Sequence, residues 1–121
     1  MTIETITHHG VDLAVVSGEG KCITDVSSAM DLAMTARAET GASRLVLPKK
    51  LIAEDFFILS TGLAGEILQK WINYRFKAAI WGDYSRYTSK PLHDFMGESN
   101  QGSDFFFTAS REEAMDRLAG V

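Results

Sequence analysis

Two neighbouring hydroxyl groups stand where a helix is expected to begin. Ser60 and Thr61 lie in the stretch ILSTGLAGEIL, directly before an amphipathic run. A Ser at this position caps a helix by accepting a hydrogen bond from a first-turn N–H, which contributes about 1 kcal/mol. The same free N–H groups and the positive end of the helix dipole also favour a phosphate or a bound anion. A simple cap is the favoured interpretation, and phosphorylation or anion binding at Ser60, Thr61 and Gly62 is the alternative.

A second group of polar side chains lies in the loop GDYSRYTSK, after an expected buried strand. It contains Asp83, Tyr84, Ser85, Arg86, Tyr87, Thr88, Ser89 and Lys90. Another connection, with Glu54 and Asp55, also follows a strand. Because ligands tend to bind beyond the carboxyl ends of parallel strands, the two loops are expected to share one functional edge of a sheet.

The charges of these two loops allow two interpretations. Arg86 and Lys90 can pair with Glu54 and Asp55, or hold an anionic group. An ion-paired, solvated loop is favoured, and a binding surface for a partner or a small ligand is the alternative. Tyr84 and Tyr87 either serve as interface anchors or bury their rings and leave only the hydroxyls in water.

Other reactive side chains lack the spacing that chemistry requires. His8 and His9 are consecutive, so on a strand they point to opposite faces and cannot chelate one metal ion. The pair Gly20–Lys21 lacks the other residues of a phosphate-binding loop. Cys22 is the only cysteine and is expected to be a small buried thiol. We therefore expect no catalytic residue, no metal and no cofactor.

These side chains are positioned by an expected alternation of strands and helices. Residues 2–16 predict two strands around a turn at Gly10, and RLVL, KAAIWG and FFF predict three more. Serines mark most of the helix starts: helices are expected from Ser27 to Gly41, from Ser60, from Ser89, and from Ser110 to Gly120. Met30 and Met34 are expected to face inward, and GESNQGSD is expected to end the third helix. The alternation predicts one α/β domain over residues 1–121, with a mostly parallel sheet and helices packed on it.

Composition narrows the class of protein. The 121 residues are 45% hydrophobic and 23% charged, with a formal net charge of −4. One domain of this size buries a core, and its charge argues against nucleic acid or an acidic membrane as a partner. No apolar run reaches the length of a membrane span, and no signal peptide is visible. With a single cysteine, these features indicate the cytoplasm.

Two long stretches carry a resemblance to a known family. EDFFILSTGLAGEILQKWINY and GDYSRYTSKPLHDF resemble the bacterial family called domain of unknown function 4180, over nearly the whole chain. This resemblance implies no activity. A second similarity is to STAS domains, the small anti-sigma-factor antagonists, which share the order of elements. Their switch has the pattern Asp-Ser-Ser/Thr-Gly-Leu-Gly, whose first hydroxyl accepts phosphate from a kinase. It aligns with Ser60, Thr61, Gly62 and Leu63, while Leu59 replaces the Asp and the last glycine comes later, as Gly65.

Two functions of different classes follow. The favoured one is a non-enzymatic bacterial regulatory or adaptor domain of STAS-like type, which binds another bacterial protein through the Ser60 helix start and the Tyr84–Lys90 loop. It is favoured because no residues form a nucleophile with its base and orienting group. The alternative is a small anionic-ligand-binding protein or small enzyme, with its site between the Glu54–Asp55 and Asp83–Lys90 loops. A homodimer is compatible with a domain of this size.

Overall fold

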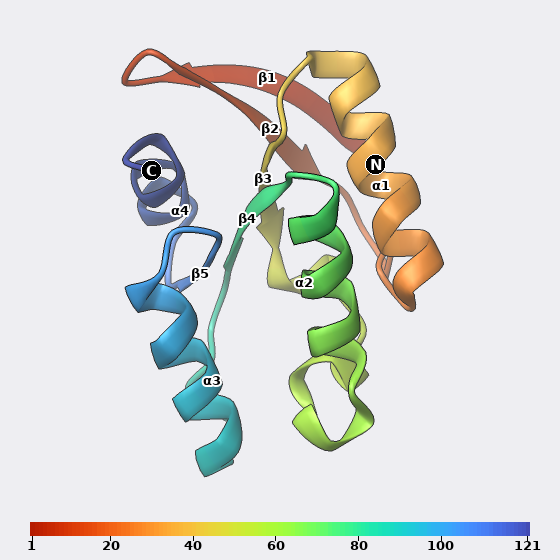
Figure 1. Cartoon of the computed structure of the whole chain (residues 1–121), viewed down its shortest axis with the longest axis vertical. Coiled ribbons are helices and arrows are strands. Elements are labelled where there is room, and N and C mark those ends of the chain that lie inside the picture. Colours follow the sequence, from red (N-terminus) through yellow and green to blue (C-terminus); the bar gives the residue numbers. More distant parts are fainter.

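The computed structural model describes residues 1–121 as one α/β domain built on a five-stranded sheet (Figure 1). The strands are β1 (Thr2–His8), β2 (Val11–Ser17), β3 (Arg44–Pro48), β4 (Lys77–Trp81) and β5 (Phe105–Thr108). Their order across the sheet is the same as along the chain. β1 and β2 form an antiparallel hairpin, and the other neighbours pair in parallel. The predicted hairpin and mostly parallel sheet are confirmed.

Helices cover both faces of this sheet. They are α1 (Val26–Thr40), α2 (Leu63–Asn73), α3 (Lys90–Gln101) and α4 (Arg111–Ala119). The first three join consecutive parallel strands and share one core cluster, whereas α4 packs on the other face. Because the strand order never reverses, the sheet lacks the crevice at which doubly wound folds bind ligands. None of the helices has the length and apolar character needed to cross a membrane.

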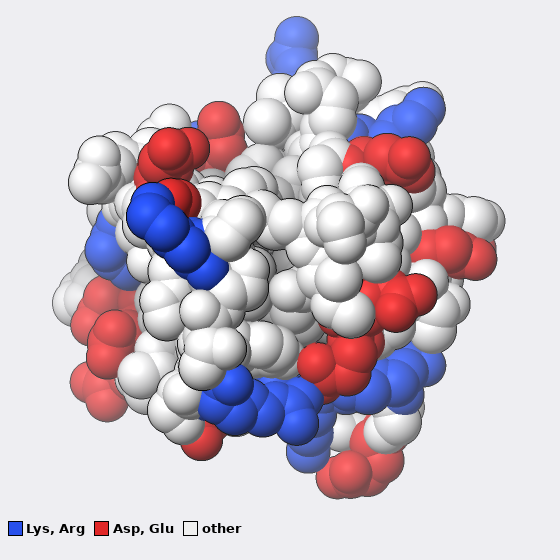
Figure 2. Space-filling view, turned by 90° about the horizontal axis from the view of Figure 1, so that it is seen from below, with Lys and Arg blue, Asp and Glu red and all other residues white.

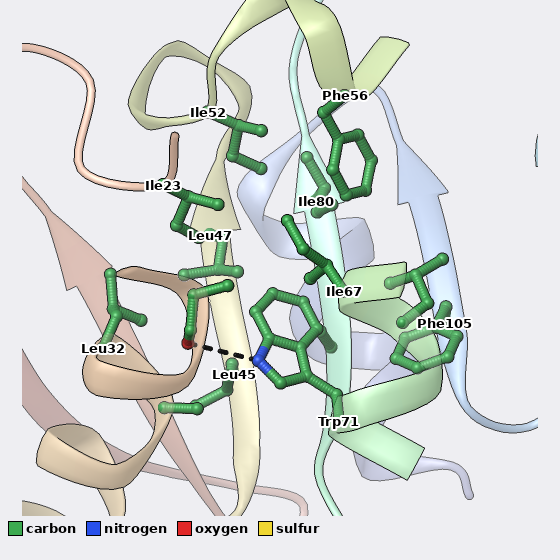
Figure 3. Close-up of a cluster of buried hydrophobic side chains, with 14 of the residues drawn as sticks. Ile23, Leu32, Leu45, Leu47, Ile52, Phe56, Ile67, Trp71, Ile80 and Phe105 are labelled. Carbon is green, nitrogen blue, oxygen red and sulfur yellow. Dashed lines mark hydrogen bonds between the residues drawn. The ribbon is translucent and has the colours of Figure 1, made fainter. Parts of the chain in front are cut away.

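Alternate residues of the central strands supply the two cores. Leu45 and Leu47 point toward α1 and α2, while Val46 between them points toward α4. This double burial explains why these strands are continuously apolar in sequence. Figure 3 shows the larger core, in which the fully buried Trp71 of α2 donates its indole N–H to the carbonyl of Ala29 in α1, at 3.2 Å.

Local signals set most helix ends. Gly41, with φ of 75°, ends α1 as predicted, and the Ser110 side chain accepts from the Glu113 N–H at the start of α4. The start of α1 is capped by Asp25, which accepts from the Ser28 N–H at 2.7 Å. The Ser28 hydroxyl accepts in return from the Asp25 N–H at 3.1 Å. This reciprocal box escaped prediction because its third helical residue is Ser rather than Glu or Gln.

Two predictions about helices are wrong. Met34 is 45% exposed, because α1 faces the sheet through Ala29, Leu32, Ala33 and Ala36, and Met34 lies beside this stripe. The third helix does not end within GESNQGSD but continues to Gln101, since Gly97 adopts a helical backbone and Asn100 is held against β5. A tertiary contact here outweighs weak local helix propensity.

The expectation that His8 and His9 diverge is also wrong. His8 is the last residue of β1, but His9 lies in the hairpin turn with φ of 50°. Strand alternation does not apply to a residue with this left-handed backbone. Both imidazoles consequently approach the same carboxylate, that of Asp116 on α4.

Candidate functional site

The two predicted loops meet at the carboxyl edge of the sheet, which Figure 2 views directly. Arg86 forms an ion pair with Glu54, and the Tyr87 hydroxyl donates to the other oxygen of that carboxylate at 2.9 Å. Partial burial opposes ionisation of Glu54, but the Tyr87 hydrogen bond and the charges of Arg86 and Lys49 lower its pKa overall. The predicted pairing of Arg86 with the acidic connection is confirmed.

Lys90 and Asp55 do not join this network. Lys90 is the first residue of α3 and pairs with Asp94 one turn later, at 2.7 Å. Its backbone position directs the side chain along the helix surface, where pairs four residues apart meet. Asp55 contributes its backbone carbonyl to a turn rather than its carboxylate to an ion pair. The suggested pairing of Lys90 with either acid of the connection is wrong.

The two tyrosines of the loop have different roles. Tyr84 is largely buried against Phe57 and Phe107, and its hydroxyl donates to the carbonyl of Ile80 at 2.7 Å. Burial raises the pKa of this phenol. Tyr87 is half-buried, stacks on Phe57 with ring centroids 5.5 Å apart, and turns its hydroxyl to the surface. Tyr84 therefore anchors the loop internally, and Tyr87 forms part of the edge surface.

Ser60 does not cap α2. The chain passes through two short 3-10 turns, Glu54–Phe57 and Leu59–Thr61, and α2 begins only after Gly62, whose φ is 78°. Thr61 fastens this connection: its hydroxyl lies 2.7 Å from the Asp55 carbonyl and accepts from the Leu63 N–H at 3.2 Å. The cap interpretation of Ser60 is wrong because the left-handed Gly62 separates its side chain from the first turn. Ser60 is exposed.

Two open depressions flank Arg86 on this edge. The first, which we call the Ser60 groove, has a volume of about 380 Å³ and is lined by residues 57–60, 86–89 and Pro91. It joins the Ser60 turn to the polar loop, and Ile58 at its rim is 50% exposed. Thr88 and Ser89 line its other side, and the Ser89 hydroxyl also caps α3, as predicted, by accepting from the Leu92 N–H.

The second depression, which we call the lysine cleft, has a volume of about 410 Å³. Its charged lining consists of four basic and two acidic residues: Lys21, Lys49, Lys50, Arg86, Glu54 and Asp83. The Lys49 ammonium lies over the Tyr87 ring, 4.9 Å from its centroid. A side chain at Gly82 would come within 2.7 Å of Lys49, so the glycine makes room for this lysine. Figure 2 shows basic side chains gathered along one side of the edge.

A family model described as "Domain of unknown function (DUF4180)" matches residues 8–118. The chain belongs to this family. No curated protein and no solved structure matches the chain. The DUF4180 match spans both loops of the carboxyl edge, so the residues that line the Ser60 groove and the lysine cleft lie within the matched range. The similarity to STAS domains, based on residues 59–65, stays a prediction.

The lysines are the part of this DUF4180 site that sequence reasoning missed. Lys49 and Lys50 directly follow β3, and Lys21 lies in the Gly-rich loop after β2. Their positions beyond parallel strands were the available signal. Asp83 balances part of this charge: hydrogen bonds from Ser85 lower the pKa of its carboxyl, and Lys49 and Arg86 lower it further.

Proposed function

We propose that this DUF4180 chain is a non-enzymatic regulatory or adaptor domain of STAS-like type, which binds another bacterial protein in the cytoplasm through the Ser60 groove. The observation that carries the proposal is the groove itself, which combines an exposed Ile58 with Tyr87 and Arg86. Tyr and Arg are enriched among residues that dominate interface energies. A sheet without a ligand crevice also favours recognition on an open surface.

The exposed Ser60 hydroxyl gives this surface a means of regulation. It lies in the groove with the Arg86 guanidinium among the other lining residues. A phosphate on Ser60 adds a charge of about −2 and three strong acceptors, which an arginine can bind. The proposal therefore includes Ser60 as a phosphate acceptor that changes partner affinity. Self-association as a homodimer is a further part of it.

Substitutions in the groove test the adaptor function. Ile58→Asp and Arg86→Ala are each expected to weaken binding of the native partner at least about tenfold, because interface anchors contribute about 2 kcal/mol or more and about 1.4 kcal/mol is a factor of ten. The tagged chain is used to capture partners from the native bacterium, and the affinity of the purified partner is then measured by calorimetry. Thermal melts establish that both variants are folded.

Glu112→Ala is the matched control, since Glu112 is exposed on α4, on the other face of the sheet. It is expected to leave the affinity unchanged. A partner that binds wild type and both groove variants equally would contradict the proposal, as would capture of no partner at all. Phosphate on Ser60 in the captured chain, read by mass spectrometry, would support the switch.

A second candidate function is binding of a small anion in the lysine cleft. Four basic residues face only two acidic ones there, on a chain whose net charge is −4. Such a local excess of positive charge concentrates anions against the overall charge. Lys50 pairs with Glu19 at 3.2 Å, whereas the Lys49 ammonium lies over the rings of Phe57 and Tyr87.

Thermal shifts with inorganic pyrophosphate test the second candidate. Pyrophosphate is expected to raise the melting temperature of wild type saturably, because a ligand that binds only the folded state adds RT ln(1 + [L]/Kd) to stability. The Lys21→Ala, Lys49→Met double variant should lose the shift, with methionine keeping the aromatic contact. Lys70→Ala, an exposed lysine of α2, is the control. Equal shifts in all three proteins would indicate a general salt effect and contradict an anion site.

A further inference from the structure

Three side chains that can bind a metal ion converge where the tip of the β1–β2 hairpin meets α4. This place lies at the opposite end of the parallel strands from the Ser60 groove. The His8 Nε2 lies 2.6 Å from the Asp116 Oδ1, and the His9 Nε2 lies 3.5 Å from the same oxygen. One potential ligand atom from each residue falls within 4.8 Å of the other two. The two imidazole rings are 4.2 Å apart between centroids.

The packing of α4 on β1 fixes this arrangement. Arg111 at the start of α4 pairs with Glu4 of β1 at 3.7 Å. One turn later, Met115 packs against the same small core cluster as Ile6. Asp116 then meets His8 at the end of the strand. These successive contacts set the register between helix and strand, and Figure 1 shows the hairpin turn beside α4.

The backbone of His9 completes the set. Its φ of 50° is uncommon for a residue with a side chain, and it brings the second imidazole to the side of the first. His8 is the more enclosed ligand, with 23% of its side chain exposed, while 70% of the His9 side chain is exposed. The site is therefore partly built into the fold and partly open to solvent.

We propose that His8, His9 and Asp116 bind one divalent transition-metal ion of the Zn²⁺ class. Two imidazole nitrogens and one carboxylate oxygen suit Zn²⁺ and related ions, whereas Mg²⁺ and Ca²⁺ prefer oxygen ligands. With Zn–N and Zn–O distances of about 2.0–2.2 Å, tetrahedral ligand atoms stand about 3.3 Å apart. The separations of 2.6 and 3.5 Å from the Asp116 oxygen to the two imidazole nitrogens lie on either side of this value. The ion takes the place of the direct contact between His8 and Asp116, and its remaining positions are open to water or another ligand.

The metal also joins two parts of the fold, since its ligands come from the β1–β2 hairpin and from α4. Binding stabilises the docked arrangement of the hairpin and α4 over states in which they separate. Zinc is therefore expected to raise the melting temperature. This effect is independent of the Ser60 groove and the lysine cleft, which lie beyond the opposite ends of the parallel strands.

Calorimetric titration of the chain with ZnCl₂, prepared without a histidine tag, tests the site. Wild type is expected to bind one Zn²⁺ per chain, and His8→Ala, His9→Ala and Asp116→Asn should each weaken binding at least about tenfold. His9→Ala is the most informative variant, because His9 is the most exposed ligand and its loss leaves the packing of β1 and α4 intact. The melting temperature should rise with Zn²⁺ in wild type but not in these variants.

The remaining histidine and the only cysteine provide the controls. His93 lies near the start of α3 with its Nε2 2.6 Å from the carbonyl of Tyr87, at the opposite end of the parallel strands from the hairpin tip. His93→Ala and Cys22→Ser are expected to bind Zn²⁺ as wild type does. The proposal is overturned by wild type that shows no saturable binding, or by equal affinity in wild type and His9→Ala. It is also overturned if Cys22→Ser alone abolishes binding.

Discussion

Replacing Trp71 with alanine is expected to lower the free energy of unfolding by about 3–5 kcal/mol, the usual cost of truncating a buried large aromatic residue. Trp71 is fully buried in the core between the sheet and α1–α3. Its ring packs near Phe105 with centroids 6.4 Å apart. Alanine leaves a cavity bounded by several elements, and a close-packed core relaxes into it only partly. Urea unfolding followed by circular dichroism measures the loss.

Phenylalanine at the same position separates packing from hydrogen bonding. Trp71→Phe keeps most of the apolar contact but removes the N–H that donates to Ala29, so a smaller loss of about 1–2 kcal/mol is expected. Trp81→Phe is the matched comparison, because the buried Trp81 N–H has no acceptor. Removal of this indole N–H should leave the free energy of unfolding unchanged or raise it slightly. Equal losses for the two phenylalanine variants would show that the Ala29 bond contributes nothing.

The boundaries of helices and strands in this fold were predictable where a single nearby residue determines them. The hairpin follows from Gly10, the end of α1 from Gly41, and the start of α3 from Ser89. The start of α2 was mispredicted at Ser60 because a residue-by-residue pattern cannot show that Gly62 takes a left-handed backbone. Thr61 decides this by bonding to carbonyls of the preceding turns.

The candidate sites divide in the same way. The meeting of Arg86 with Glu54 was predictable, because parallel strands send their following loops to one edge. The cluster of His8, His9 and Asp116 was not, since it depends on the return of α4 across the second face and on a strained turn residue. Residues 108 positions apart meet there through packing that only the tertiary structure reveals.

Replacing Asn100 is expected to have the second large effect on stability, because its side chain hydrogen-bonds to the side of β5 that has no neighbouring strand. β5 is the last strand of the sheet, so one side of its backbone has no neighbouring strand. The Asn100 side chain occupies that side: its Oδ1 accepts from the Phe107 N–H at 2.7 Å, and its Nδ2 donates to the Phe107 carbonyl at 3.1 Å. The side-chain amide thus takes the place of one residue of an additional strand.

Asn100→Ala removes both bonds and leaves two partly buried backbone groups without partners. Unsatisfied groups of this kind cost about 1–3 kcal/mol each, so the two together cost about 2–6 kcal/mol. The better helix propensity of alanine returns about 0.6 kcal/mol, so a net loss of about 1.5–5 kcal/mol is expected. Glu98→Ala, an exposed change on the same helix, should stay within about 0.5 kcal/mol of wild type. Urea unfolding distinguishes the two, and equal stability of both variants would contradict the bridging role.

The same substitution is expected to promote aggregation as well as unfolding. Phe105, Phe106 and Phe107 make β5 an apolar strand, and an unprotected apolar edge pairs readily with another chain. Light scattering at a temperature at which the variant remains folded should therefore rise for Asn100→Ala and not for Glu98→Ala. If Asn100→Ala lost stability without an increase in scattering, the Asn100 side chain would stabilise the sheet but would not protect its edge against aggregation. Loss of stability together with new scattering would show that one side chain both stabilises the sheet and blocks its edge against further strands.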